Sequence, residues 1–164
     1  MYTAINLYPD ELTLRTISSI NERADQQTCS AQTIAEAIKN NAMKIIWAID
    51  EDRDHLILGY AAYRPDARDL RSFQGRKNNK PKVYLSSIAT TPQGKEKGAE
   101  TALLKKVMNV GQGRLYLHHH GSTWYKDFAN SEGLDWREKS CGTYKDGSPK
   151  IEMKLQAKVI IQHF

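Results

Sequence analysis

Residues 88–104 read IATTPQGKEKGAETALL, and this stretch decides the fold. The run VYLSSIAT, which ends at Thr90, is typical of a buried strand, and Pro92 stops it. A charged turn follows, then Gly98, and then apolar residues at helical spacing as far as Val110. A glycine before a helix leaves the first backbone N–H groups accessible, and these groups carry a partial positive charge. The stretch therefore predicts either an anion site made of backbone amides or an ordinary solvated turn.

Two common phosphate-binding patterns are absent from the sequence. It contains neither GxxxxGK[ST] nor GxGxxG, so a Walker-type loop and a dinucleotide fingerprint are both excluded. An anion site here would consist mostly of backbone amides, with the side chains of Lys95 and Lys97 beside it.

The elements around this stretch predict a mixed α/β sheet. The helix that ends near Gly111 lies between two strands, which should form a right-handed parallel crossover. The full expected order is β-α-α-β-β-β-α-β-α-β-β. Its parts are a strand over 2–7, a helix begun by Pro9–Glu11, a helix capped by Ser30, strands over 44–50, 56–63 and 82–90, a helix over 99–110, a strand over 114–120, a helix over 123–132, and two strands about the turn KDGSP.

Composition indicates one soluble domain over residues 1–164. Hydrophobic residues make up 40% and charged residues 26%, and no apolar run approaches the roughly 20 residues that span a bilayer. The N-terminal segment resembles no export signal, so we expect a cytoplasmic protein without a membrane partner.

Cys29 and Cys141 sit in no metal or redox spacing and are interpreted as ordinary thiols. The net charge of +5 favours anionic binding partners: nucleic acid, an acidic protein face or a phosphate-rich cofactor.

Residues 64–82 predict a long exposed basic loop. The segment has few apolar residues, and its last part, RKNNKPK at 76–82, carries four basic side chains and no acidic one. Such a loop is either simply solvated or contacts nucleic acid. In a transferase it could also select an acidic acceptor.

The stretch IATTPQGKEKGAETALL resembles the acyl-CoA-binding core of the GNAT superfamily of N-acetyltransferases. The signature of that family is Arg/Gln-x-x-Gly-x-Gly/Ala, and two registers are available here. A register that starts at Gln93 buries a lysine, whereas one that starts at Lys95 puts Gly98 at the key glycine and the run 102–104 at the apolar positions that follow. We adopt the second register. Lysine then replaces Arg/Gln, and Glu100 stands where Gly or Ala is usual.

The resemblance implies a GNAT-like α/β fold and acetyl-CoA as the acyl donor, with no metal. The expected fold is a mixed, mostly antiparallel sheet of about seven strands with four helices and a splayed parallel strand pair around the cofactor cleft. Backbone groups of the strand and of the motif turn would bind the donor, and Ser122 would contact it after the next strand. The positions assigned to the cofactor are Ile88, Ala89, Thr90, Lys95, Glu96, Lys97, Gly98, Ala99, Glu100 and Ser122.

The family's closing motif FYxxxGF has a partial match at residues 128–134, where Ala129 replaces the usual tyrosine. Tyr125 lies one helical turn earlier, on much the same face. It is our first candidate to assist the departing thiolate. The other interpretation is that Tyr125 and Trp124 only pack the helix against the sheet.

Three histidines occur in a row at positions 118–120. Consecutive strand residues point to opposite faces, so the three side chains cannot converge on one metal ion. His118 or His120 could relay a proton from the acceptor amine, with His119 facing the other way. Each could equally be a surface or packed histidine. The strand VYLSSIAT has no carboxylate, so solvent is another destination for the proton.

The predicted function is acetyl transfer from acetyl-CoA to an amine by direct attack in a ternary complex. The main chain at Thr90 would polarise the thioester carbonyl. The alternative is a catalytically weakened GNAT-like binding module that contacts nucleic acid through residues 64–82. The sequence leaves open whether the acceptor is a small molecule, a protein or tRNA, whether the acyl group is longer than acetyl, and whether the chain forms a homodimer.

Overall fold

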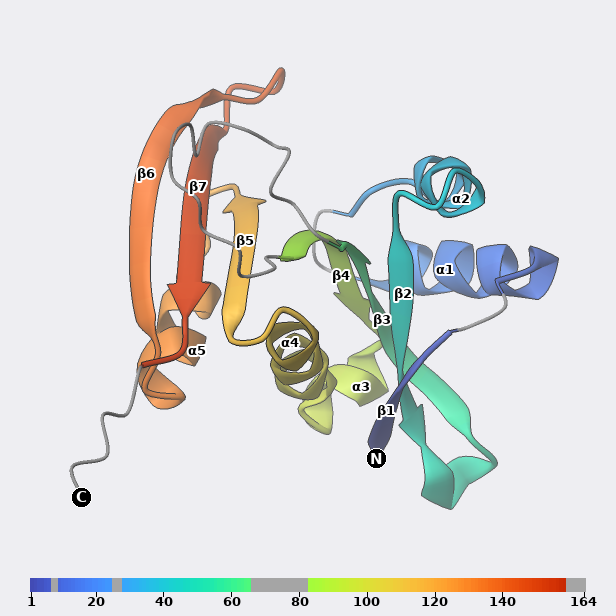
Figure 1. The fold of residues 1–164 in the computed structure, drawn as a ribbon. Helices are drawn as coiled ribbons and strands as arrows, with labels where there is room; N and C mark the ends of the chain where they lie inside the picture. Colours follow the sequence, from blue (N-terminus) through green and yellow to red (C-terminus); the bar gives the residue numbers. More distant parts are fainter. Residues whose placement is uncertain (7–8, 25–27, 66–82, 159–164) are drawn as a thin grey trace, which may run out of the picture.

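The computed structural model describes residues 1–6, 9–24, 28–65 and 83–158 (Figure 1). Within these ranges the predicted order of strands and long helices is confirmed. No described helix is long and apolar enough to cross a bilayer. The elements are β1 (Tyr2–Ile5), α1 (Glu11–Arg23), α2 (Ala31–Lys39), β2 (Lys44–Asp50), the short 3₁₀ helix η1 (Glu51–Arg53), β3 (Leu56–Arg64), β4 (Val83–Thr90), α3 (Pro92–Glu96), α4 (Ala99–Val110), β5 (Arg114–His119), α5 (Trp124–Ser131), β6 (Asp135–Thr143) and β7 (Pro149–Gln156).

One helix was not predicted, which makes five α-helices in the described ranges instead of four. The charged turn after β4 is the short helix α3, and its first turn has both common start signals. The hydroxyl of Thr91 accepts the backbone N–H of Gly94 at 3.0 Å, and Pro92 occupies the first helical position. A capped turn of five residues has too little hydrophobic periodicity to be recognised from sequence.

All seven strands form one sheet in the order β1-β2-β3-β4-β5-β7-β6. Only β4 and β5 are parallel, as the crossover through α4 requires, and every other pair is antiparallel. The prediction of a mixed, mostly antiparallel sheet is therefore confirmed.

The parallel pair is short. It consists of three residue pairs, from Val83 opposite Leu115 to Leu85 opposite Leu117, although β4 continues to Thr90. The pairing stops where Ser86 is an extra residue in β4: Ala62 of β3 faces Ser87, and the next residue of β3 faces Leu85. Such a bulge bends the strand and increases its twist. The second half of β4 thus has no pairing with β5, which is the predicted splay.

Helices cover both faces of the sheet (Figure 1). On one face, Leu103 and Val107 of α4 pack with Leu117 of β5 in a core that also contains Phe128 of α5. On the other face, α1 and α2 pack over β2, β3 and the end of β4, with Ile17 in the buried cluster. The alternation of side chains along each strand therefore separates the molecule into an α4/α5 face and an α1/α2 face.

An ion pair between an exposed lysine and a buried carboxylate ties the turn before α4 to the sheet. The carboxylate of Asp50, at the end of β2, is 2% exposed and pairs with the ammonium of Lys97. It also accepts the backbone N–H of Asp52 at 3.1 Å. The hydrogen bond from Lys97 is the main cause that lowers the pKa of Asp50. Since the folded pKa lies below the unfolded value of about 3.9, the pair adds stability above that pH and loses it as the pH falls through the folded pKa.

We predict that Asp50→Asn lowers the thermal unfolding midpoint at neutral pH, because Lys97 loses its counter-charge. The difference from the parent protein should shrink as the pH falls from about 4, the unfolded pKa, and should vanish below the lower pKa of folded Asp50. Thermal unfolding followed by circular dichroism over this pH range measures both effects. Asp52→Asn, an exposed neighbour, is the control and should change neither. Parallel pH profiles for the parent and Asp50→Asn would contradict the prediction.

Candidate active site

The first turn of α4 has no side-chain cap. Gly98 precedes it in the left-handed region, at φ +74°, and a methyl group there would meet nothing within 4 Å. The bond from Ala102 N–H to Gly98 O, at 3.1 Å, is the first i→i−4 bond of the helix. The N–H groups of residues 99–101 precede it and have no helical partner of that kind. This helix start can therefore receive an anion from the open side of Gly98.

A second glycine anchors this turn, and the sequence patterns did not identify it. A side chain at Gly94 would lie 2.3 Å from the carbonyl oxygen of Leu58 in β3. The same carbonyl accepts the backbone N–H of Thr91 at 2.9 Å and its hydroxyl at 3.2 Å. The close approach of α3 to β3 therefore excludes any residue but glycine at position 94, and it fixes the direction in which α4 begins.

The end of β4 presents main-chain groups on its unpaired side. Because Thr91 donates to β3, alternation directs the main-chain groups of Ala89 to β3 and those of Ile88 and Thr90 away from it. Ala89 O lies 2.6 Å from the position of a Cβ on Gly59 of β3, consistent with this alternation. Ile88 and Thr90 thus face the side where β5 has diverged, and an extended ligand could pair with them.

The other motif residues have different environments. The side chains of Lys95 and Glu96 are exposed on α3, and Ala99 is fully buried in the core. The ammonium of Lys97 forms an ion pair with Asp50, so this side chain stabilises the turn before α4.

Glu100 points back toward the sheet. Its carboxylate accepts a hydrogen bond from the hydroxyl of Thr90 at 3.2 Å, and the side chain is partly buried. After burial, its negative charge is the second cause that raises the pKa of Tyr125. The carboxylate therefore lies at the end of β4.

Tyr125 lies in the first turn of α5. Its ring contacts His119, with centroids 5.7 Å apart, and Trp124 at 5.2 Å. Burial, with a smaller effect of Glu100, raises the pKa of Tyr125 to about 12. The phenol therefore stays protonated at neutral pH and can donate a hydrogen bond. Ala129, one turn later, is fully buried in the core, so no hydroxyl replaces the usual one there.

His118 lies on the α1/α2 face and contacts Tyr84 of β4. The hydroxyl of Tyr84 is 2.9 Å from Nδ1 of His118, and the ring of Tyr116 contacts both. Burial, with a further contribution from Lys150, lowers the pKa of His118. Burial likewise raises the pKa of Tyr84. At neutral pH the pair is therefore an uncharged imidazole beside an uncharged phenol.

His120 contacts residues of the turn between β6 and β7. Its ring stacks on Tyr144, with centroids 3.8 Å apart, and its Nδ1 lies 2.9 Å from the hydroxyl of Ser148. Ser148 in turn donates to Asp146. The structure therefore does not bring His120 together with the Tyr84 and His118 pair in one hydrogen-bond network.

His119 is the histidine on the α4/α5 face. It is 4% exposed, and its Nδ1 accepts the backbone N–H of Gly121 at 3.0 Å. Its proton is therefore on Nε2, which lies 2.9 Å from the carboxylate of Glu138. Sequence reasoning placed His119 on the opposite face from His118 but did not identify these contacts, since Glu138 is brought to it only by the pairing of β6 with β7.

A cysteine ties the segment between α1 and α2 to the bulge in β4. The thiol of Cys29 donates to the carbonyl of Ser86, and its backbone N–H donates to the hydroxyl of Ser87, both at 3.3 Å. The hydroxyl of Tyr60 lies 3.1 Å from Ser87 and donates to Asn21 of α1 at 2.6 Å. Burial raises the pKa of the Cys29 thiol. This network holds the α1/α2 face of the splay in place.

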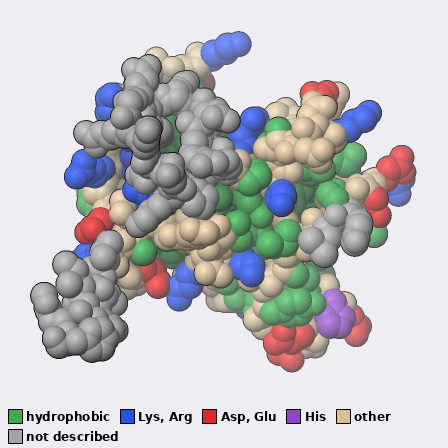
Figure 2. All heavy atoms as spheres, in the orientation of Figure 1, with side chains coloured by type: hydrophobic (Ala, Val, Ile, Leu, Met, Phe, Trp, Pro, Cys, Tyr) green, Lys and Arg blue, Asp and Glu red, His purple; other side chains and the backbone are tan. Residues whose placement is uncertain are grey.

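The remaining predictions concern Ser122, a metal and the basic loop. Ser122 is exposed, and its hydroxyl accepts the backbone N–H of Trp124 at 3.2 Å in the turn that leads into α5. Among the residues that the structure describes, no group of three potential ligands could hold a metal ion. Residues 66–82, most of the predicted loop 64–82, lie outside the described ranges. Described basic side chains are scattered among hydrophobic and acidic ones on the face in Figure 2.

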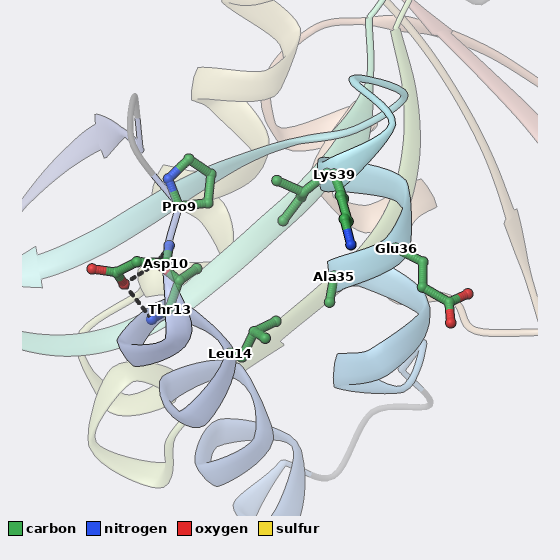
Figure 3. A pocket seen from close by; sticks show the side chains of 8 residues that line it. Pro9, Asp10, Thr13, Leu14, Ala35, Glu36 and Lys39 are labelled. Carbon is green, nitrogen blue, oxygen red and sulfur yellow. Dashed lines mark hydrogen bonds between the residues drawn. The ribbon is translucent and has the colours of Figure 1, made fainter.

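A pocket of about 310 Å³ lies elsewhere, between the start of α1 and the end of α2 (Figure 3). It is mostly apolar and contains none of the predicted site residues. Its lining includes Pro9, Thr13, Leu14, Ala35, Ile38 and Lys39.

No protein-family model matches the sequence, and a comparison with curated proteins finds no match. Solved structures do match. The ribosomal-protein-S18-alanine N-acetyltransferase from Escherichia coli is 14% identical, covers 99% of both chains and has a TM-score of 0.62. A protein from Desulfovibrio desulfuricans assigned to the GNAT family of acetyltransferases is 19% identical over 94% of this chain and 98% of that one, with a TM-score of 0.67.

Arabidopsis thaliana NAA60, solved in complex with acetyl-CoA, is 12% identical over 93% of this chain and 97% of that one, with a TM-score of 0.67. These similar structures span almost the full length of the chain, and their TM-scores of 0.62 to 0.67 show a common fold. The chain has the fold of the GNAT acetyltransferases.

Proposed function

We propose that this protein is an N-acetyltransferase that transfers an acetyl group from acetyl-CoA to an amine by direct attack in a ternary complex. The observation that carries the proposal is the position of the uncapped first turn of α4 beside the unpaired end of β4. The start of α4 can bind phosphate, and the end of β4 can pair with an amide-containing arm. The short helix α3 connects the two. Two of the similar structures support the same reaction: the Escherichia coli protein is named an N-acetyltransferase, and the Arabidopsis thaliana protein was solved with acetyl-CoA.

The described residues fit the donor in two respects. The open side of Gly98 leaves room for the pyrophosphate at the α4 N-terminus, and Ile88 and Thr90 offer main-chain groups to the pantetheine arm. When bound, acetyl-CoA supplies the activated thioester. The N–H of Thr90 is our candidate to polarise its carbonyl. The negative charge of Glu100, at the start of α4, opposes the fit.

Tyr84 and His118 are our candidates to receive the proton of the acceptor amine. If Nδ1–H of His118 donates to the oxygen of Tyr84, Nε2 has a free lone pair and can act as a base. The lowered pKa of His118 keeps the imidazole uncharged at neutral pH, as a base requires. His120 is a weaker candidate because Ser148 and Tyr144 already engage it.

Tyr125 is our candidate to stabilise the departing thiolate. With a pKa of about 12, its phenol is a weaker acid than a thiol of pKa about 8.5. Complete proton transfer to the sulfur is therefore unfavourable. Tyr125 acts in the proposal as a hydrogen-bond donor, on the opposite face of the sheet from the Tyr84 and His118 pair.

The acceptor is either a protein or a small-molecule amine. The name of the Escherichia coli structure refers to a protein acceptor, so a protein amine is the first class to test. Mass spectrometry of a cell extract incubated with the protein and isotope-labelled acetyl-CoA identifies acceptors by their labelled acetyl groups. No protein-dependent label on any amine would contradict the proposed activity.

We predict that the protein binds CoA and that Gly98→Ala weakens binding about tenfold or more, which corresponds to about 1.4 kcal/mol. A Cβ at this position projects into the open side that would admit the pyrophosphate, and it strains a backbone at φ +74°. Isothermal titration calorimetry gives the affinity. The matched control is Gly133→Ala, because Gly133 has φ +67° and equally open surroundings at the end of α5.

The two glycine variants separate strain from ligand contact. Both should lose similar stability, roughly 1–2 kcal/mol, but only Gly98→Ala should lose affinity. No heat of binding to the parent protein at high CoA concentration would contradict the donor site, and so would equal affinities of the two variants.

We predict that His118→Gln lowers kcat/KM by about 10²- to 10⁴-fold, measured with an acceptor found by the labelling experiment. The pKa of His118 is lowered, so kcat/KM of the parent protein should rise through a midpoint below about 6.5 and then level off. His118→Gln should lose this acidic limb, which initial rates over a pH series would show. His55→Gln, an exposed histidine near Tyr2, is the control and should keep it. Retention of the limb in His118→Gln would exclude His118 as the base.

We predict that Tyr125→Phe lowers kcat about tenfold, equivalent to about 1.4 kcal/mol of lost transition-state stabilisation, with little change in KM. Phenylalanine keeps the contacts with His119 and Trp124 and removes only the hydroxyl. Thiol release measured with a chromogenic disulfide gives the rate. Tyr2→Phe, an exposed tyrosine, is the control. An unchanged kcat would restrict Tyr125 to packing α5.

A further inference from the structure

Glu100 is a negative charge at the point where the proposed donor site requires a positive one. It is the second residue of α4, and its carboxylate is held 3.2 Å from the hydroxyl of Thr90. A carboxylate in the first turn interacts favourably with the partial positive charge of the helix start. In the ligand-free protein, Glu100 therefore supplies the anion that the uncapped turn attracts.

The lysines of the turn are outnumbered by carboxylates. Lys97 pairs with the buried carboxylate of Asp50, and the side chain of Lys95 is exposed on α3. Across residues 95–100 together with Asp50 there are two lysines and three carboxylates, a net charge of one negative unit. The anion site is thus locally acidic, although the whole chain carries a net charge of +5.

We propose that Glu100 is a resident anion that competes with the pyrophosphate of CoA for the start of α4 and thereby sets the affinity for the donor. The inference rests on the proposed function, because it places CoA at the same helix start. Two negative charges within several ångströms of each other repel strongly in a partly buried site. Binding therefore requires the Glu100 side chain to move away from Thr90.

This competition makes stability and affinity respond in opposite directions. Removal of the charge at position 100 takes away the favourable interaction with the helix start, so the ligand-free protein becomes less stable. The same change removes the repulsion and tightens CoA binding. A residue with a purely structural role would lower both.

The test compares Glu100→Gln with the parent protein by isothermal titration calorimetry at fixed ionic strength. Glutamine has nearly the same size, and its amide oxygen can still accept the hydrogen bond from Thr90, so the change isolates the charge. We expect Glu100→Gln to bind CoA about fivefold or more tightly. Acetyl-pantetheine, which lacks phosphate, should bind both proteins within about a factor of two. Glu96→Gln removes an equal charge from the exposed side of α3 and should change CoA affinity less than about twofold.

Each outcome decides a separate point. Unchanged or weaker CoA binding by Glu100→Gln overturns the inference, and so does equal tightening of CoA and acetyl-pantetheine, which would indicate a steric effect. An equal gain in Glu96→Gln also overturns it, because the effect would then belong to net charge and not to position. If Glu100→Gln binds CoA and the parent protein does not, the inference is supported and the proposed function of the natural chain fails. If neither binds, both fail.

Discussion

The early end of the parallel pairing between β4 and β5 is the constraint on which the site depends. Three residue pairs hold the two strands together, and the bulge at Ser86 then turns β4 away. A backbone without a strand partner normally costs stability unless another group satisfies it. Here the unsatisfied edge runs directly into α3 and the uncapped start of α4. The same divergence thus produces both features on which the proposed donor site depends, the unpaired end of β4 and the uncapped start of α4.

The alternation of side chains along β5 gives the two faces of the splay different chemistry. His119 is directed to the α4/α5 face, where Glu138 and Gly121 fix its neutral tautomer beside Tyr125. His118 is directed to the other face, where it meets Tyr84. The proposed base for the amine, His118, and the proposed donor for the thiolate, Tyr125, therefore lie on opposite faces of the sheet. In the proposed mechanism the acetyl group passes between them through the gap in strand pairing.

The electrostatics of the motif turn differ from those of the whole chain. A net charge of +5 favours anionic ligands at long range, but this field is screened within about 8–10 Å at physiological salt. At contact distance the site is governed by Asp50, Lys97 and Glu100. Lys97 stabilises the turn through its ion pair with Asp50, and for that reason its charge does not reach the proposed ligand. Rigidity of the motif and attraction for phosphate are therefore in competition here.

The sequence by itself determined the order of the strands and long helices, the single parallel crossover and the position of Gly98 before α4, because these follow from local periodicity and from the conformational freedom of glycine. It also determined that His118 and His119 face opposite ways. Only the tertiary structure decided that α3 is helical, that Gly94 packs on Leu58, that Lys97 pairs with Asp50, and that Glu100 turns toward Thr90. These are contacts between residues far apart in the chain or between side chains with several available rotamers. Local pattern carries no information about them, because they depend on how the strands pair and on where the bulge in β4 directs the chain.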